Sequence, residues 1–127
     1  MMRGLKNKFT GQCGEDAATE LLRKKGYKIV ERNYRNKIGE IDIIAKNKED
    51  LVFVEVKTRR SEKFGTPAEA VTYYKKQKIV NTAKWYLSNN PTELNIRFDV
   101  IEVYGSFDGT AFNLDEINHY KQVFLEV

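Results

Sequence analysis

The sequence predicts one mixed α/β domain over residues 1–127, with the element order α-β-β-β-α-β. Three features support this fold class. Apolar residues recur at helical spacing near residues 14–25 and 66–89, and they alternate with polar residues along 38–45 and 97–104. Leu51 to Val54 is an uninterrupted apolar run, which is typical of a central strand.

The first helix is expected over residues 14–25. Ala17, Ala18, Leu21 and Leu22 recur there at helical spacing, and Gly26 ends the pattern. The preceding residues 1–12 are basic and contain no apolar core segment. We therefore expect a flexible N-terminal segment there and not a secretory signal.

Three strands are expected next, over residues 27–34, 38–45 and 51–57. In the second strand Glu40, Asp42 and Ile44 alternate with Ile41, Ile43 and Ala45, so each set shares one face. The short turn over residues 46–50 favours an antiparallel hairpin between the second and third strands.

The second helix is expected from Thr66 to about Asn89. Thr66 and Glu69 have the spacing of a capping box, and Pro67 stands at the first helical position. A fourth strand over residues 97–104 follows. Beyond it we expect a short strand over 111–114 and a closing helical turn over 117–124.

Nearly all basic residues lie within the first 98 residues. Residues 1–98 hold 21 Lys and Arg against 12 Asp and Glu, a net charge of +9, whereas residues 99–127 have a net charge of −5. A basic body of this kind favours a polyanionic partner, most often nucleic acid. Ordinary surface charge on a globular domain is the alternative.

Cysteine content and hydropathy exclude several classes of protein. The single Cys13 excludes a disulfide scaffold and a Cys-rich zinc site. No apolar run approaches the length that spans a membrane, so no membrane association is expected. A cytoplasmic, reducing location is the resulting expectation.

Charged residues stand at the end of the most apolar strand. Leu51 to Val54 is followed directly by Glu55-Val56-Lys57, and a strand period of two points Glu55 and Lys57 to the same side. If this face coincides with the acidic face of the preceding strand, three carboxylates and one amine converge. Burying such carboxylates without partners is costly.

A divalent cation would relieve that cost. Mg²⁺ takes oxygen ligands and often uses one or two carboxylates with water, and it can activate water against a phosphate. The alternative is a salt-bridged strand end, in which Lys57 pairs with Glu55 or Glu40.

These segments carry a family resemblance. Gly39-Glu40-Ile41-Asp42-Ile43-Ile44-Ala45 and Leu51 to Arg59 resemble the PD-(D/E)XK nuclease signature. More closely, the chain resembles the YraN family of small restriction-endonuclease-like proteins, which are related in fold to archaeal Holliday junction resolvases. Further matching segments are Gly14 to Ala18, Phe64 to Thr72 with Lys75, Arg97 to Val100, and Ile117-x-His119.

The resemblance implies a restriction-endonuclease-like fold, a mixed central β-sheet flanked by helices. It implies that Asp42, Glu55 and the Val56 carbonyl bind Mg²⁺ or Mn²⁺, that Lys57 is the catalytic lysine and that Glu15 reaches the same site. Glu40 would lie beside the metal. Ile41 replaces the usual Pro before Asp42, and Tyr73-Tyr74 stands where Pro and a basic residue are expected.

Several other residues have two interpretations. Near a metal site the basic residues Arg59, Arg60, Lys63, Lys75 and Lys76 would contact phosphates; otherwise they are solvated surface. Tyr73, Tyr74 and Trp85 would stack on unpaired bases or simply pack. The alternative for Glu15 is an acid that is favoured near a helix start. Gly11 and Gly14 are interpreted as a flexible entry to the helix. His119 is interpreted as a structural residue.

The leading hypothesis is a metal-dependent endonuclease that hydrolyses phosphodiester bonds in DNA, in structured or damaged substrates. The alternatives are a nucleic-acid-binding module without turnover and a protein-interaction adaptor that retained the fold. Resolvase-like relatives usually dimerise, so a homodimer is also an expectation.

Overall fold

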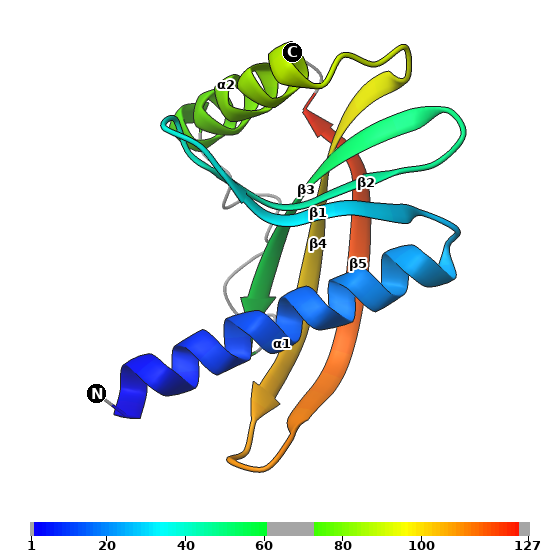
Figure 1. The fold of residues 1–127 in the computed structure, drawn as a ribbon. Coiled ribbons are helices and arrows are strands. Elements are labelled where there is room, and N and C mark those ends of the chain that lie inside the picture. Colours follow the sequence, from blue (N-terminus) through cyan, green and yellow to red (C-terminus); the bar gives the residue numbers. More distant parts are fainter. Residues whose placement is uncertain (1, 61–72, 125–127) are drawn as a thin grey trace.

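A computed structural model describes residues 2–60 and 73–124, and it places side chains over 11–60 and 73–123. Two helices and five strands are present in this part of the chain (Figure 1). In chain order they are α1 (Met2–Lys24), β1 (Lys28–Arg35), β2 (Glu40–Lys46), β3 (Asp50–Arg59), α2 (Tyr73–Asn89), β4 (Asn95–Phe107) and β5 (Phe112–Phe124). The predicted α/β class and the element order are confirmed as far as β4.

The five strands form one mixed sheet in the order β1-β2-β3-β4-β5. Neighbouring strands are antiparallel, as predicted for the β2–β3 hairpin, except that β3 and β4 are parallel. A parallel pair needs a long crossover connection, and α2 lies in the connection between β3 and β4.

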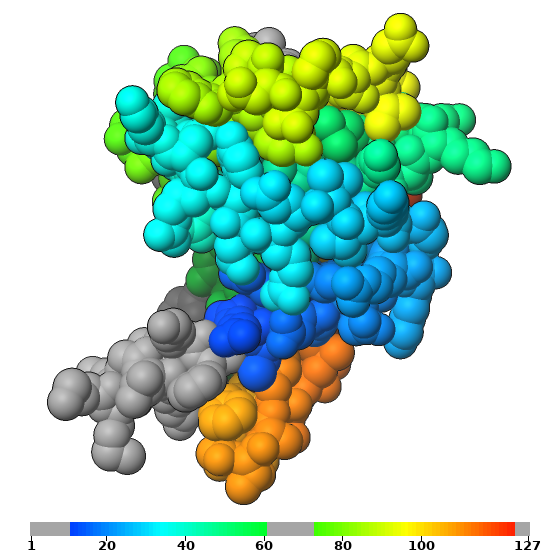
Figure 2. Space-filling view, in the orientation of Figure 1, coloured from blue at the N-terminus to red at the C-terminus, as the bar shows by residue number. Residues whose placement is uncertain are grey.

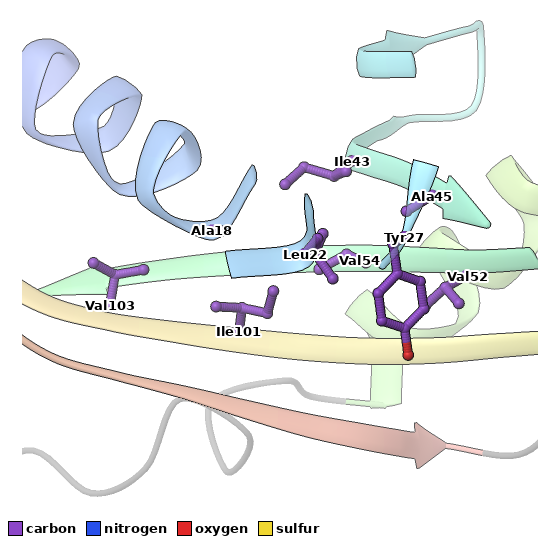
Figure 3. Packing of buried hydrophobic residues seen from close by; sticks show 9 residues of the cluster. All are labelled: Ala18, Leu22, Tyr27, Ile43, Ala45, Val52, Val54, Ile101 and Val103. Carbon is purple, nitrogen blue, oxygen red and sulfur yellow. The ribbon is translucent and has the colours of Figure 1, made fainter. Parts of the chain in front are cut away.

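Two apolar cores cover the two faces of the sheet. Figure 3 shows the first, in which Ala18 and Leu22 of α1 pack on Ile43, Val54 and Ile101. The second core joins α2 to the opposite face, and its buried members are Ile41, Ile44, Leu51, Phe53, Val80, Ala83, Tyr86 and Phe98. The sheet is therefore a middle layer, and its central strands are buried from both sides.

The helix α1 is longer than predicted. It begins at Met2, so it includes residues 2–12, where the sequence predicted a flexible segment, and it continues through Gly11 and Gly14. Glycine weakens a helix interior, which is why the pattern indicated a helix start at this point. The structure instead places Gly14 inside the helix, where it allows close contact with β3.

The prediction of a closing helical turn over residues 117–124 is wrong, because β5 runs as a strand to Phe124. Its polar residues obscured the pattern, since Asn118 and Tyr120 donate hydrogen bonds to the buried carboxylate of Glu102. The strand also supplies partners for the main chain of β4, which is buried from Phe98 to Gly105.

One residue of β2 lies on the unexpected face. Simple alternation groups Ile41 with Ile43 and Ala45, but Ile41 packs in the second core with Ile44. The pairing of β2 with β3 begins only at Ile43, whereas Glu40 and Ile41 pair with β1 alone.

The part of the second helix predicted over residues 66–72 lies outside the described residues. Neither α1 nor α2 is long and apolar enough to cross a membrane.

Candidate functional site

The site is formed where β2 and β3 separate. Their pairing ends at Ile43 and Val54, and the next residues, Asp42 on β2 and Glu55 on β3, are not paired with each other. The Val56 N–H then donates a hydrogen bond to Asp42 Oδ2, with a donor–acceptor distance of 2.8 Å. The side chain of Asp42 thus takes the place of the next main-chain partner, and this holds its carboxylate beside β3.

The carboxyl groups of Asp42 and Glu55 are in hydrogen-bonding contact. Burial and the charge of Asp42 raise the pKa of Glu55 to about 8, although Lys57 opposes the shift. Burial also raises the pKa of Asp42. Without a cation, the pair therefore holds a proton near neutral pH.

Lys57 lies beside this pair, and its Nζ is 3.6 Å from Glu55 Oε1. The ion pair that the salt-bridge interpretation predicts is present. It does not neutralise the cluster, because one ammonium faces two carboxylates and the pKa of Glu55 stays raised. A proton on the pair balances the cluster near neutral pH, and a divalent cation would take the place of that proton.

Glu55 and Lys57 open into a cavity of about 670 Å³ between the β1–β2 connection, the end of β3 and the start of α2. Its lining residues are Arg35, Asn36, Lys37, Ile38, Gly39, Glu40, Glu55, Lys57, Tyr74, Lys75, Lys78 and Ile79. Figure 2 shows β1 and the β1–β2 connection, in cyan, lying between α2 and α1. Five of the lining residues are basic and two are acidic, so the cavity favours an anionic ligand.

Glu40 lies on the cavity lining and forms an ion pair with Arg35. Arg35 donates two hydrogen bonds to Glu40 Oε2, from Nε at 3.0 Å and from Nη2 at 2.6 Å. Glu40 also lines the cavity, and its charge contributes to the raised pKa of Asp42. Glu40 therefore forms an exposed ion pair with Arg35 at the border of the site.

Glu15 lies in the middle of α1, so its interpretation as an acid near a helix start is wrong. Burial and the charge of Asp42 raise its pKa, whereas Arg32 and a hydrogen bond with Asn33 lower it. Arg32 Nη2 lies 3.7 Å from Glu15 Oε1. The structure thus places Glu15 near Asp42 but gives it partners from β1.

Three supporting residues were not singled out for these roles by sequence reasoning. Gly14 packs against Thr58, directly after Lys57, and so brings α1 and Glu15 to the end of β3. Arg32 and Asn33 hold Glu15 from β1. Asn33 has a φ of 53°, a left-handed conformation that asparagine tolerates. The only sequence signal for this conformation is an asparagine within a predicted strand.

Over the described ranges 2–60 and 73–124, no group of three or more His, Cys, Asp and Glu residues is arranged to hold a metal ion. Asp42 and Glu55 offer a two-carboxylate set instead. The N–H and C=O of one strand residue face the same neighbour, so the Val56 carbonyl faces the side on which Asp42 lies. Two carboxylates and a carbonyl, completed by water, suit Mg²⁺.

The predicted phosphate-contacting residues are divided in space. Lys75 lines the cavity, whereas Lys76 is half-buried on α2 and is not among the lining residues. Arg59 is half-buried and Arg60 exposed, at the end of β3. Lys63 lies outside the described residues.

His119 belongs to a different cluster, against the α1 side of the sheet. Its Nε2 lies 2.7 Å from Asp99 Oδ2, and its Nδ1 lies 2.9 Å from Lys25 Nζ. Arg97 donates two further hydrogen bonds to Asp99. None of these residues lines the cavity.

The sequence has relatives among known proteins. A profile of the family described as "Uncharacterised protein family UPF0102" matches residues 14–103. A UPF0102 protein of Caldanaerobacter subterraneus subsp. tengcongensis is 48% identical over 97% of this chain and 100% of its own length. A UPF0102 protein of Clostridium acetobutylicum is 48% identical over 92% of this chain and 97% of its own. A UPF0102 protein of Clostridioides difficile is 52% identical over 79% of this chain and 89% of its own length.

Proposed function

Since the chain belongs to uncharacterised protein family UPF0102, whose name assigns no activity, we propose a function from the site itself. The proposed function is that of a metal-dependent endonuclease that hydrolyses phosphodiester bonds in DNA. The proposed fold is restriction-endonuclease-like, in keeping with the PD-(D/E)XK resemblance of β2 and β3.

One observation carries the proposal: Asp42, Glu55 and Lys57 converge at the point where β2 and β3 separate, beside a basic cavity. Two carboxylates in contact, half-buried and opposed by a single ammonium, are poorly balanced alone. A divalent cation between them removes that imbalance. The raised pKa of Glu55 supports the same interpretation.

In this proposal Asp42, Glu55 and the Val56 carbonyl hold Mg²⁺ or Mn²⁺. When bound, the ion lowers the pKa of a coordinated water and polarises the scissile phosphate. The Lys57 ammonium neutralises negative charge that develops on the phosphate. The basic cavity wall, which includes Lys78 and Arg35, binds neighbouring phosphates and sets the direction of the strand.

A nucleic-acid-binding module without turnover is the second candidate. The observation that favours it is the excess of basic residues around the cavity, which requires no chemistry. The two candidates differ in what they demand of Asp42 and Glu55, because a binding module has no use for two acids in contact beside a basic cavity.

A cleavage assay separates the two candidates. Purified protein is incubated with Mg²⁺ or Mn²⁺ and with duplex, branched, flap and single-stranded DNA, with RNA as a control. We expect Asp42→Asn and Glu55→Gln to lose at least about a hundredfold in rate. Glu49→Gln, an exposed acid in the β2–β3 turn, is the matched control and should retain wild-type activity.

The folding of each variant is checked by thermal melting. If the wild type binds DNA and cuts none of these substrates with either metal, the endonuclease proposal is rejected and the binding module remains. Absence of both binding and cleavage would leave the adaptor hypothesis.

A further inference from the structure

Two tyrosines at the start of α2 are not part of either core. Tyr73 and Tyr74 are 77% and 74% exposed, whereas Tyr86 on the same helix is 7% exposed. A single exposed aromatic side chain is ordinary. Two adjacent ones with so little burial contribute little to packing, so their rings are available to a ligand.

Tyr74 lines the same cavity as Glu55 and Lys57. Lys78, one turn further along α2, lines it as well, so an aromatic ring and an ammonium share this wall. Tyr74 therefore shares a cavity with the residues that the proposed function assigns to the scissile phosphate.

The position of this wall is fixed by close packing. A Cβ atom added to Gly39 would lie 2.8 Å from Thr82 Oγ1 and 3.3 Å from Lys78 Cγ. The helix thus rests directly on the main chain of Gly39, which also lines the cavity. This contact holds α2 at a defined distance from β2, and Tyr74 is held with it.

An aromatic ring beside several ammonium and guanidinium groups is suited to one nucleotide, with its base against the ring and its phosphate against the cations. Stacking of this kind accepts any base, because every base has a π face. In a continuous duplex both faces of each base are covered by neighbouring pairs. Only an unpaired or unstacked nucleotide can offer a face to Tyr74.

We propose that Tyr74 stacks on an unpaired base next to the scissile phosphate, so that the substrate class is DNA with unpaired nucleotides at a flap or fork. This inference rests on the proposed function for its cleavage readout alone. Binding and stacking are measured without it.

The test uses DNA flaps that carry 2-aminopurine in the unpaired arm, together with a continuous duplex of the same sequence. Stacking on the protein changes 2-aminopurine fluorescence, and the measurement is made without divalent metal, so it does not depend on cleavage. We expect the change with wild type and with Tyr74→Phe, which keeps the ring. Tyr74→Ala should lose it and should bind the flap about fivefold to a hundredfold more weakly, with unchanged binding to duplex.

Trp85→Ala is the matched control, because Trp85 is also an exposed aromatic residue of α2 but does not line the cavity. It should leave flap binding unchanged. Thermal melting checks that each variant is folded, and Tyr74→Phe separates loss of the ring from loss of the hydroxyl group.

The two proposals can fail separately. Fluorescence changes that depend on Tyr74 without any cleavage support the stacking site and reject the nuclease. Cleavage that is equal on flap and duplex and insensitive to Tyr74→Ala supports the nuclease and overturns the stacking site. Absence of flap binding, or a loss that is equal for flap and duplex, also overturns it.

Discussion

Gly14 of α1 lies directly against Thr58 of β3, and a Cβ atom added there would overlap the Thr58 hydroxyl group and lie 3.0 Å from Thr58 Cβ. This contact brings α1 to the strand segment that carries Glu55 and Lys57. It also places Glu15, the next residue, close enough to Asp42 for their charges to interact. The glycine is thus a packing residue of the site.

Gly14→Ala should destabilise the protein, because the added methyl group overlaps a β-branched side chain that cannot move away freely. Overpacking of this kind costs about 1–3 kcal/mol of the free energy of unfolding. Urea denaturation measures it. Gly11→Ala is the matched control, since nothing lies within 4 Å of a Cβ atom there, and it should stabilise the helix by up to about 1 kcal/mol.

Removal of the Thr58 side-chain branches should relieve the effect. In Thr58→Ala protein the additional cost of Gly14→Ala should be smaller than in wild type, which a double-mutant cycle measures. Equal stability of the Gly14→Ala and Gly11→Ala proteins would show that the close contact is absent.

The pair of Asp42 and Glu55 should make the metal-free protein less stable as pH rises. Burial and Asp42 raise the pKa of Glu55 to about 8, whereas its unfolded value is about 4.3. The folded state therefore binds more protons than the unfolded state between these values, and stability is lost as pH rises through this window. Chemical denaturation from pH 4 to pH 9 measures the loss.

Mg²⁺ should reverse this loss in the wild type, because it binds the ionised pair in the folded state alone. Glu55→Gln removes the group with the largest shift, so it should reduce the pH dependence in this window and abolish the stabilisation by Mg²⁺. A Glu55→Gln protein with an unchanged response to pH and to Mg²⁺ would contradict this assignment.

The opposite pH dependence is expected from Asp99. Burial alone would raise its pKa, but hydrogen bonds from His119 and Arg97 outweigh burial and lower the pKa. The stability from this group is therefore complete above its unfolded pKa of about 3.9 and is lost as pH falls below that value. Denaturation of wild type and Asp99→Asn at pH 7 and pH 3 measures it.

Asp99→Asn should cost about 1.5–3 kcal/mol at pH 7, because Arg97 loses one of its two charged partners, although it keeps Asp50. At pH 3 the difference from wild type should shrink. A constant difference across this range would mean that Asp99 is not ionised in the folded protein.

Lys57→Met should separate metal binding from chemistry. The variant keeps Asp42 and Glu55, so Mg²⁺ should still stabilise it, whereas the proposed charge neutralisation at the phosphate is lost. We expect the cleavage rate to fall by about 10²–10³-fold, measured under single-turnover conditions. Loss of the metal effect together with activity would instead assign Lys57 a structural role.

The sequence predicted the part of the site that lies on regular strands. The apolar run from Leu51 to Val54 and the period of two place Glu55 and Lys57 on one side, and the structure brings both together with Asp42. The hairpin predicted between β2 and β3 is also confirmed, because it too depends on regular strands joined by a short turn. The hydrogen bond from Val56 to Asp42 depends on the separation of the strands, which no pattern indicates.

The remaining features depend on contacts between distant segments. The strand β5 carries Asn118 and Tyr120, which donate hydrogen bonds to the buried Glu102, so its pattern did not alternate as expected for a core strand. The role of Gly14 follows from its approach to Thr58, 44 positions along the chain. Glycine in a helical pattern indicates a helix end when only local propensity is considered.

The central claim is that Asp42 and Glu55 share one divalent cation. Anomalous diffraction from crystals of the protein grown with Mn²⁺ tests it most directly. We predict one strong peak about 2.1 Å from a carboxylate oxygen of each residue and from the Val56 carbonyl oxygen, and no peak at that position in Asp42→Asn crystals. The absence of the peak from wild-type crystals, with the two carboxyl groups still in contact, would contradict the claim.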